Sequence, residues 1–189
     1  MTTPPLPVSA ANITHQYDDH TVQPVGTDTT IDWTDLLDRL AGGGTFWPTT
    51  IDGAGRPHTR PVLAVVADGV LVTASSTTAA KTTALRAERP TSIATSVAGL
   101  DVVWAGTSRR ISGPTELAAV TAAYQSTYGW PADIADDALT APYGAPTAGP
   151  PPYEAFRIEP TTVHAIGTDT PFTARSTKWN FASAERPRA

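Results

Sequence analysis

The most constraining feature of the sequence is an Asp-Gly pair between two short valine-rich runs. Residues 62–67 read Val-Leu-Ala-Val-Val-Ala, residues 70–73 read Val-Leu-Val-Thr, and Asp68-Gly69 lies between them. Valine is β-branched and favours extended strands. An Asp-Gly pair between such runs is typical of a two-residue hairpin turn, in which both central residues need φ > 0. The sequence therefore predicts an antiparallel hairpin at this point.

Further elements are predicted on both sides of this hairpin. Apolar periodicity, together with terminating Gly or Pro residues, predicts helices at 33–40, 79–88 and 115–128. Alternating or apolar runs predict strands at 45–51, 91–97, 101–112, 153–158 and 162–166. Asp32 and Thr115 are the expected N-caps of the first and third helices. Residues 131–152, rich in Pro, Gly and Ala, are predicted to form a long loop. Mostly antiparallel neighbours with helices at the edges favour a small barrel or sandwich.

Length, charge and composition limit the classes of function. A chain of 189 residues with 40% hydrophobic content is expected to form one domain. The net charge of −5 argues against nucleic acid or a membrane surface as a partner. The absence of cysteine excludes disulfides and thiolate nucleophiles, and no metal site is expected. No signal peptide or spanning segment is evident, which predicts a cytoplasmic protein. Residues 1–30 are predicted to form an extended arm, 31–181 the folded domain, and 182–189 a polar tail.

Lysine is so scarce that the position of each lysine is informative. The chain contains two, Lys81 and Lys178. The hydroxyl-rich segment 75–78 leads from the hairpin into the predicted helix at 79–88, with Lys81 in its first turn. Hydroxyl groups, a helix start and a lysine together are suited to bind an anion. The alternative is an ordinary hairpin with a solvated lysine, which the local sequence alone favours.

Five stretches, taken in their order and spacing, resemble the pyridoxamine 5′-phosphate oxidase-like split β-barrel family. These stretches are residues 51–62, 68–69, 75–86, 128–130 and 177–181. The likeness is strongest to the branch of flavin- and deazaflavin-dependent oxidoreductases, many of which use coenzyme F420. It covers about residues 31–181 and implies a mainly β fold, a split barrel with peripheral helices. It also implies a homodimer with F420, or alternatively FMN, in a groove at the subunit interface.

The resemblance also implies which residues hold the cofactor. The backbone of Thr59, Arg60, Pro61 and Val62 would lie along the ring system. The path to the phosphate would be lined by Thr73, Ser75 and Ser76, and Lys81 would pair with the phosphate itself. Lys178 and Trp179 would approach the ring. Many relatives have arginine at the positions of Lys178 and Asn180, and this difference counts against the long anionic tail of F420 more than against the fold.

A bound flavin or deazaflavin would carry the hydride chemistry, so that no nucleophile or metal is required. The candidate proton donors are Tyr128, Tyr143 and His58. The loop at 131–152 is expected to cover a small organic substrate, with Trp130, Tyr143 and Tyr153 as walls; core packing of these aromatic residues is an equally open interpretation. The leading hypothesis is an oxidoreductase, by analogy one acting in secondary metabolism. The alternative is a non-catalytic module that binds a flavin, haem or another metabolite, and pyridoxamine phosphate oxidation is a weaker third hypothesis.

Overall fold

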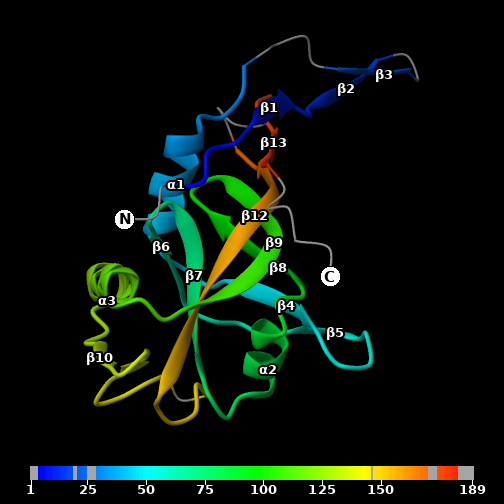
Figure 1. Ribbon diagram of the computed structural model, residues 1–189. Helices are drawn as coiled ribbons and strands as arrows, with labels where there is room; N and C mark the ends of the chain where they lie inside the picture. The colour runs from blue at the N-terminus through cyan, green and yellow to red at the C-terminus, as the bar shows by residue number, and fades with distance from the viewer. Residues whose placement is uncertain (1–3, 19–20, 25–28, 146, 170–173, 183–189) are drawn as a thin grey trace.

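The structure of the chain is a computed structural model, shown in Figure 1, that describes residues 4–18, 21–24, 29–145, 147–169 and 174–182. Of the predicted polar tail at 182–189, all but Ala182 lies outside the described residues. Parts of the predicted N-terminal arm, at 1–3, 19–20 and 25–28, also lie outside them.

Six antiparallel strands close a barrel. In order around the barrel they are β4 (Trp47–Ile51), β8 (Pro90–Val97), β9 (Leu100–Ile111), β12 (Tyr153–Gly167), β7 (Val70–Ser76) and β6 (Ala64–Ala67). The barrel closes between Phe46 and Val62, whose backbone N–H groups each bond to the other's carbonyl oxygen, at 3.1 and 2.8 Å. Closure leaves no free edge between the first and last strands. The predicted mainly β barrel with peripheral helices is confirmed.

The strand β12 changes its neighbour along one of its two edges. One edge pairs with β9 from Ala155 to Gly167, whereas the other edge pairs first with β7 and then with β13 (Thr177–Asn180). Beyond β13 lies β1 (Ser9–Asn12), so the N-terminal segment adds an outer strand. The prediction of two strands, at 153–158 and 162–166, was wrong. Pro160 lacks a backbone donor, but a β-bulge between Pro160 and Thr162 absorbs the defect and the strand continues.

The hairpin of β6 and β7 has the predicted turn. Asp68 and Gly69 both have positive φ, 48° and 72°, as a type I′ turn requires. Outside the barrel, β5 (Pro57–Thr59) pairs with β4 at one sheet edge, and β2 (His15–Asp18) pairs with β3 (Thr21–Pro24). The predicted loop at 131–152 holds a small hairpin, formed by β10 (Asp133–Ala135) and β11 (Ala138–Thr140). This segment lacks the valine-rich pattern of the other strands, and its pairing with Tyr153 of β12 through Leu139 is long-range.

Three helices pack around the barrel (Figure 1). They are α1 (Trp33–Ala41), α2 (Ala80–Arg86) and α3 (Pro114–Tyr128). Both α1 and α3 contact β6, while α2 lies against β4, β7 and β9. The third helix is capped by Gly113 and begins at Pro114, and not after Thr115 as predicted, because proline is favoured at the first helical position. Among the described residues, no helix is both long and apolar enough to cross a membrane.

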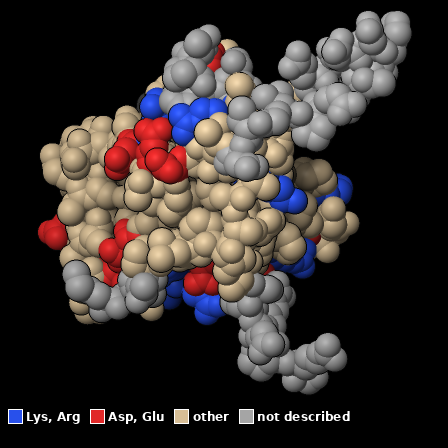
Figure 2. Space-filling model, turned by 90° about the horizontal axis from the view of Figure 1, so that it is seen from above, with Lys and Arg blue, Asp and Glu red and all other residues tan. Residues whose placement is uncertain are grey.

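Ion pairs bind two of the helices to β12. Glu154 of β12 lies 2.7 Å from Arg86 of α2 and 3.1 Å from Arg110 of β9. Arg157 lies 3.0 Å from Glu116 of α3. Figure 2, which views the molecule from above, shows acidic and basic side chains in small neighbouring groups on a largely uncharged face. Because Glu154 and Arg157 are buried, these pairs fix the positions of α2 and α3 more firmly than exposed pairs would.

Gly106 lies where β9 passes the bulge of β12. A Cβ atom at this position would overlap the carbonyl oxygen of Glu159. Gly106→Ala should therefore lower the free energy of unfolding by about 1–3 kcal/mol, the usual cost of overpacking a core, as measured by urea denaturation. Gly53→Ala is the matched control, since a Cβ atom there meets nothing within 4 Å. Equal losses of unfolding free energy in Gly106→Ala and Gly53→Ala would contradict the steric explanation.

Candidate functional site

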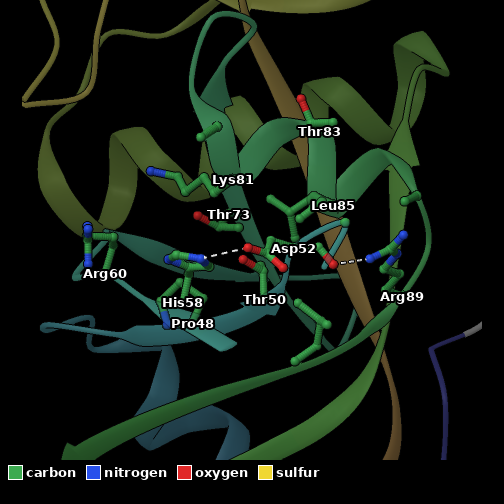
Figure 3. A pocket seen from close by; sticks show the side chains of 15 residues that line it. Pro48, Thr50, Asp52, His58, Arg60, Thr73, Lys81, Thr83, Leu85 and Arg89 are labelled. Carbon is green, nitrogen blue, oxygen red and sulfur yellow. Dashed lines mark hydrogen bonds and ion pairs between the residues drawn. The ribbon is translucent and has the colours of Figure 1, made fainter. Parts of the chain in front are cut away.

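Two adjoining cavities lie beside α2. The smaller, of about 490 Å³, is bounded by β4, β5, β7 and α2 (Figure 3). The larger, of about 710 Å³, is bounded by residues 60–63, the start of α2, the end of α3 and residues 143–145 and 147–148. Each has the volume of an ordinary small-ligand site. Arg60, Ala80 and Lys81 line both cavities and therefore mark the boundary between them.

Two cations without carboxylate partners stand at this boundary. Among the described residues, the partly buried ammonium of Lys81 makes no hydrogen bond or ion pair, and burial lowers the pKa of Lys81. The guanidinium of Arg60 donates to the carbonyl oxygen of Thr59 at 2.9 Å and reaches no described carboxylate. Figure 3 shows both side chains extending along the same side of the smaller cavity. An unneutralised Lys–Arg pair of this kind is suited to bind an anionic group.

An ionised carboxylate lies in the wall of the smaller cavity. Asp52 accepts hydrogen bonds from the backbone N–H groups of Arg56 at 2.9 Å and Ala54 at 2.8 Å, and from Nε of Arg56 at 2.9 Å. These bonds, the backbone bond from Arg56 above all, hold the pKa of Asp52 well below its usual value. Nε2 of His58 lies 3.2 Å from Oδ2 of Asp52, and Arg89 donates to the Asp52 carbonyl oxygen (Figure 3). Asp52 therefore orients His58.

The larger cavity has an aromatic wall. Trp130 stands edge-on between Tyr124, at 5.0 Å between ring centroids, and Tyr153, at 5.5 Å. The hydroxyl of the buried Tyr124 accepts from the backbone N–H of Ala74 at 2.9 Å and lies 3.2 Å from the carbonyl oxygen of Leu63, to which it donates. Burial raises the pKa of Tyr124. This tyrosine therefore anchors the segment that lines the cavity.

The three candidate proton donors lie in different surroundings. Tyr128 and Tyr143 line the larger cavity, whereas His58 lines the smaller one. The Tyr128 hydroxyl lies 2.8 Å from the carbonyl oxygen of Ala64, to which it donates, and burial raises the pKa of Tyr128. The hydroxyl proton of Tyr128 is therefore engaged in a hydrogen bond to the backbone. Tyr143 is exposed, and its carbonyl oxygen accepts a hydrogen bond from Trp130 at 2.7 Å.

The structure brings part of the predicted cofactor set together. Arg60, Pro61, Val62, Thr73 and Lys81 all line one or both cavities.

Three hydroxyl residues of the predicted set do not line either cavity. Thr59 is exposed, with its Oγ1 2.7 Å from Oγ1 of Thr49. Ser75 and Ser76 are buried behind α2: Ser75 accepts from Thr82 at 2.7 Å, and Ser76 donates to the Pro150 carbonyl oxygen at 2.7 Å. The two serines support the cavity walls without facing the cavity.

Lys178 and Trp179 lie apart from both cavities. Because side chains alternate along β13, Trp179 points into the core and Lys178 points to the opposite face, beside His164. Trp179 is 1% exposed and packs against Trp33 of α1, with ring centroids 5.6 Å apart. Within one chain, Trp179 is therefore a core residue.

Sequence reasoning did not identify Asp52, Tyr124 or Arg89 as site residues. For Asp52 a signal existed, because an aspartate before Gly53 and Gly55 commonly bonds to the backbone of its own turn. Tyr124 has the helical spacing of a core residue, which it also is. Nothing in the local sequence marks Arg89.

No known family model and no curated protein matches the chain. Solved structures do match it. A conserved hypothetical protein of Mycobacterium tuberculosis is similar with a TM-score of 0.57 and 17% identity, over 75% of this chain and 88% of that one. An FAD binding protein of Mycobacterium smegmatis is similar with a TM-score of 0.51 and 14% identity, over 72% of this chain and 96% of that one. A heme binding protein of the same species is similar with a TM-score of 0.50 and 17% identity, over 75% of this chain and 57% of that one.

At this level of identity the likenesses concern the fold. Together with the closed antiparallel barrel and its peripheral helices, they confirm the mainly β barrel fold that the sequence predicted.

The charge of Asp52 gives the turn at 52–56 a pH-dependent stability. Because the folded-state pKa of Asp52 lies below its ordinary value of 3.8, the charge stabilises the fold above about pH 4, and the contribution is lost as the pH falls toward the folded-state pKa. The melting temperature of Asp52→Asn should lie below that of the wild type near neutral pH, and the gap should narrow below about pH 4. Asp38→Asn, exposed on α1, is the control. A difference in melting temperature that stayed constant below about pH 4 would contradict this stabilising role of the Asp52 charge.

Proposed function

We propose that the chain is an oxidoreductase that binds a flavin-type cofactor by its ring and its phosphate and transfers hydride to or from a small organic substrate. F420 and FMN are the candidates that the resemblance named. The observation that carries the proposal is the pair Arg60 and Lys81, which stands between two cavities without a described carboxylate partner. A solved structure with a similar fold is that of an FAD binding protein, which agrees with a flavin on this framework.

The residues around the larger cavity fit a flat, mostly apolar ring. Residues 61–63 line one side of the cavity, and the tyrosines of α3 hold this segment in place through the carbonyl oxygens of Leu63 and Ala64. Trp130 and Tyr153 offer aromatic surface. A bound flavin or deazaflavin would supply the hydride chemistry, while the protein supplies binding, orientation and the exclusion of water.

The cavities fit haem less well than a flavin. Haem iron is usually held by His, Cys, Met or Tyr. The chain has no cysteine, and no histidine lines the larger cavity among the described residues. The four tyrosines of that cavity each donate their hydroxyl proton to a backbone carbonyl oxygen. In the smaller cavity, His58 has its Nε2 turned toward Asp52. A non-catalytic flavin-binding module remains the alternative, and it would bind the cofactor without turnover of any electron acceptor.

A second copy of the chain is the proposed partner, as the resemblance implied. Trp47, Ala94 and Val103 lie directly opposite one another on β4, β8 and β9, so their side chains share the outer face of the sheet. Trp47 and Val103 are 46% and 42% exposed, which is unusual for large apolar side chains placed side by side. The exposed strand β5 lies at the edge of the same sheet and borders the smaller cavity. A partner on this face would meet the smaller cavity along β5, at the edge of the sheet.

Removal of Lys81 should weaken cofactor binding. Lys81→Ala should raise the dissociation constant of FMN or F420 by the equivalent of about 1.5–3 kcal/mol, the value of a charge-assisted hydrogen bond. Quenching of cofactor fluorescence measures this, and the melting temperature should hardly change. Arg39→Ala, on α1, is the control for loss of a cation, because Arg39 lines neither cavity. Absence of any response of the wild type to either cofactor would overturn the proposed function.

A charge on the outer sheet face should separate the subunits. Val103→Asp should convert a dimer into a monomer in size-exclusion chromatography with light scattering, because the carboxylate would be buried without a partner. It should also weaken cofactor binding. Ala118→Asp, exposed on α3 away from this face, should remain dimeric. A monomeric wild type would show that the interface does not exist.

A further inference from the structure

The segment that runs from β5 to β6 changes its partner beside the larger cavity. Residues 57–62 bond to β4 and to Phe46, whereas residues 64–67 pair with β7. Pairing with β7 stops where residues 60–63 begin to line the larger cavity. The width of this cavity therefore depends on how far the pairing with β7 extends along the segment.

The hydroxyl of Tyr124 lies where the pairing of β6 with β7 stops. The last paired residues are Ala64 and Thr73. Because hydrogen-bonded and non-hydrogen-bonded pairs alternate from the hairpin turn, Leu63 and Ala74 would exchange the next ladder bonds. Instead, the N–H of Ala74 donates to the Tyr124 hydroxyl at 2.9 Å, and this hydroxyl donates to the Leu63 carbonyl oxygen at 3.2 Å. The hydroxyl thus bridges two groups that a direct ladder bond would join.

Tyr128, one helical turn further along α3, makes the same kind of bridge on the opposite edge of the segment. Pairing on that edge stops at Phe46 and Val62, and Gly44 and Ala64 would be the next hydrogen-bonded pair. The N–H of Gly44 donates to the Tyr128 hydroxyl at 3.2 Å, and this hydroxyl donates to the Ala64 carbonyl oxygen at 2.8 Å. Two hydroxyl groups from one helix therefore hold the two edges of the segment.

On the basis of the proposed function, we propose that Tyr124 is a positioning residue, whose hydroxyl keeps the larger cavity open by preventing the pairing of β6 with β7 from extending. Tyr124 lines this cavity, and so do Leu63 and Ala74, the two residues that its hydroxyl separates. Direct bonding of Leu63 to Ala74 would draw residues 60–63 toward β7 and narrow the space between them. Tyr128 holds the same segment from the other edge and opposes this movement.

The energetics favour closure of the cavity when the hydroxyl is absent. Tyr124 is 2% exposed, and its ring stands edge-on to Trp130 with 5.0 Å between ring centroids, so the hydroxyl has a fixed position. Without it, the N–H of Ala74 and the carbonyl oxygen of Leu63 would each lose a partner in a partly buried place, which is costly. These two groups recover most by bonding to each other, and that is the movement that narrows the cavity.

The first test compares Tyr124→Phe, which removes only the hydroxyl, with Thr127→Val on the same helix. Thr127 donates to the Ala41 carbonyl oxygen at 3.3 Å but lines neither cavity. The affinity of the folded, full-length protein for FMN and for F420 is measured by fluorescence titration. Tyr124→Phe should raise the dissociation constant roughly three- to tenfold, because the ligand must break the new ladder bond. Thr127→Val should leave it within about twofold.

A disulfide between Leu63 and Ala74 tests the same movement with Tyr124 in place. The chain has no cysteine, so Leu63→Cys combined with Ala74→Cys can form one disulfide, which directly opposed strand residues are close enough to accept. The oxidised double variant should bind the cofactor at least about tenfold more weakly than the same protein after reduction, because the disulfide holds the cavity closed. The reduced form is the matched control, and this test stands should Tyr124→Phe fail to fold.

Three results would overturn the inference. They are an unchanged affinity in Tyr124→Phe, an equal loss of affinity in Thr127→Val, and equal affinities of the oxidised and reduced double variant.

Failure of the wild type to bind either FMN or F420 would overturn the proposed function and leave the role of Tyr124 to a separate measurement. Extension of the ladder would engage the N–H of Leu63 with the carbonyl oxygen of Ala74. Amide hydrogen exchange at Leu63 should therefore be slower in Tyr124→Phe than in the wild type. An unchanged exchange rate at Leu63 would show that the hydroxyl does not hold the segment apart from β7.

Discussion

The hydrogen bonding of β12 is the constraint on which the rest of the structure depends. One edge of this strand pairs with β9, while the other changes partner from β7 to β13. A backbone group on one edge can bond to only one neighbouring strand, so the change needs an interruption in the ladder. The pairing with β7 ends at Ile158 and the pairing with β13 begins at Thr162. Between them Pro160 lacks a backbone donor, and on the opposite edge the strand bulges against β9, where Gly106 leaves the room that the bulge requires. On one side of the bulge β12 therefore completes the barrel with β7, and on the other side it pairs with β13, whose Trp179 packs against Trp33.

Closure of the barrel then creates the candidate site. The pairing of Phe46 with Val62 fixes the segment that carries Arg60, so that Arg60 and Lys81, which lie on different elements, line the same two cavities. The buried Glu154 holds α2 against the sheet through Arg86. The site is thus assembled from segments whose positions are set by backbone pairing and buried ion pairs, which is the rigidity that a cofactor site needs.

The elements that the sequence predicted are those with local causes. The turn at Asp68-Gly69 depends only on the φ angles of these two residues. The helices are marked by the local spacing of apolar residues and by the Gly or Pro that ends each of them. The continuity of β12 was missed because a proline normally breaks a strand, and only the distant Gly106 permits the bulge. For the site, the resemblance named Arg60 and Lys81, which do line the cavities. The inward direction of Trp179 depends on the register of β13 against β12, which is a long-range property and not a local one.

The pairing of β1 with β13 has a consequence for the order of folding. Ser9 lies opposite Asn180, so the first strand of the chain completes its hydrogen bonds only with the last one. Contacts of such high sequence separation carry a large loop-closure entropy and form late. During synthesis, the N-terminal segment must wait without its partner until β13 has been made. The emergence of β13, and not that of the barrel strands, is therefore the event that allows the sheet to be completed.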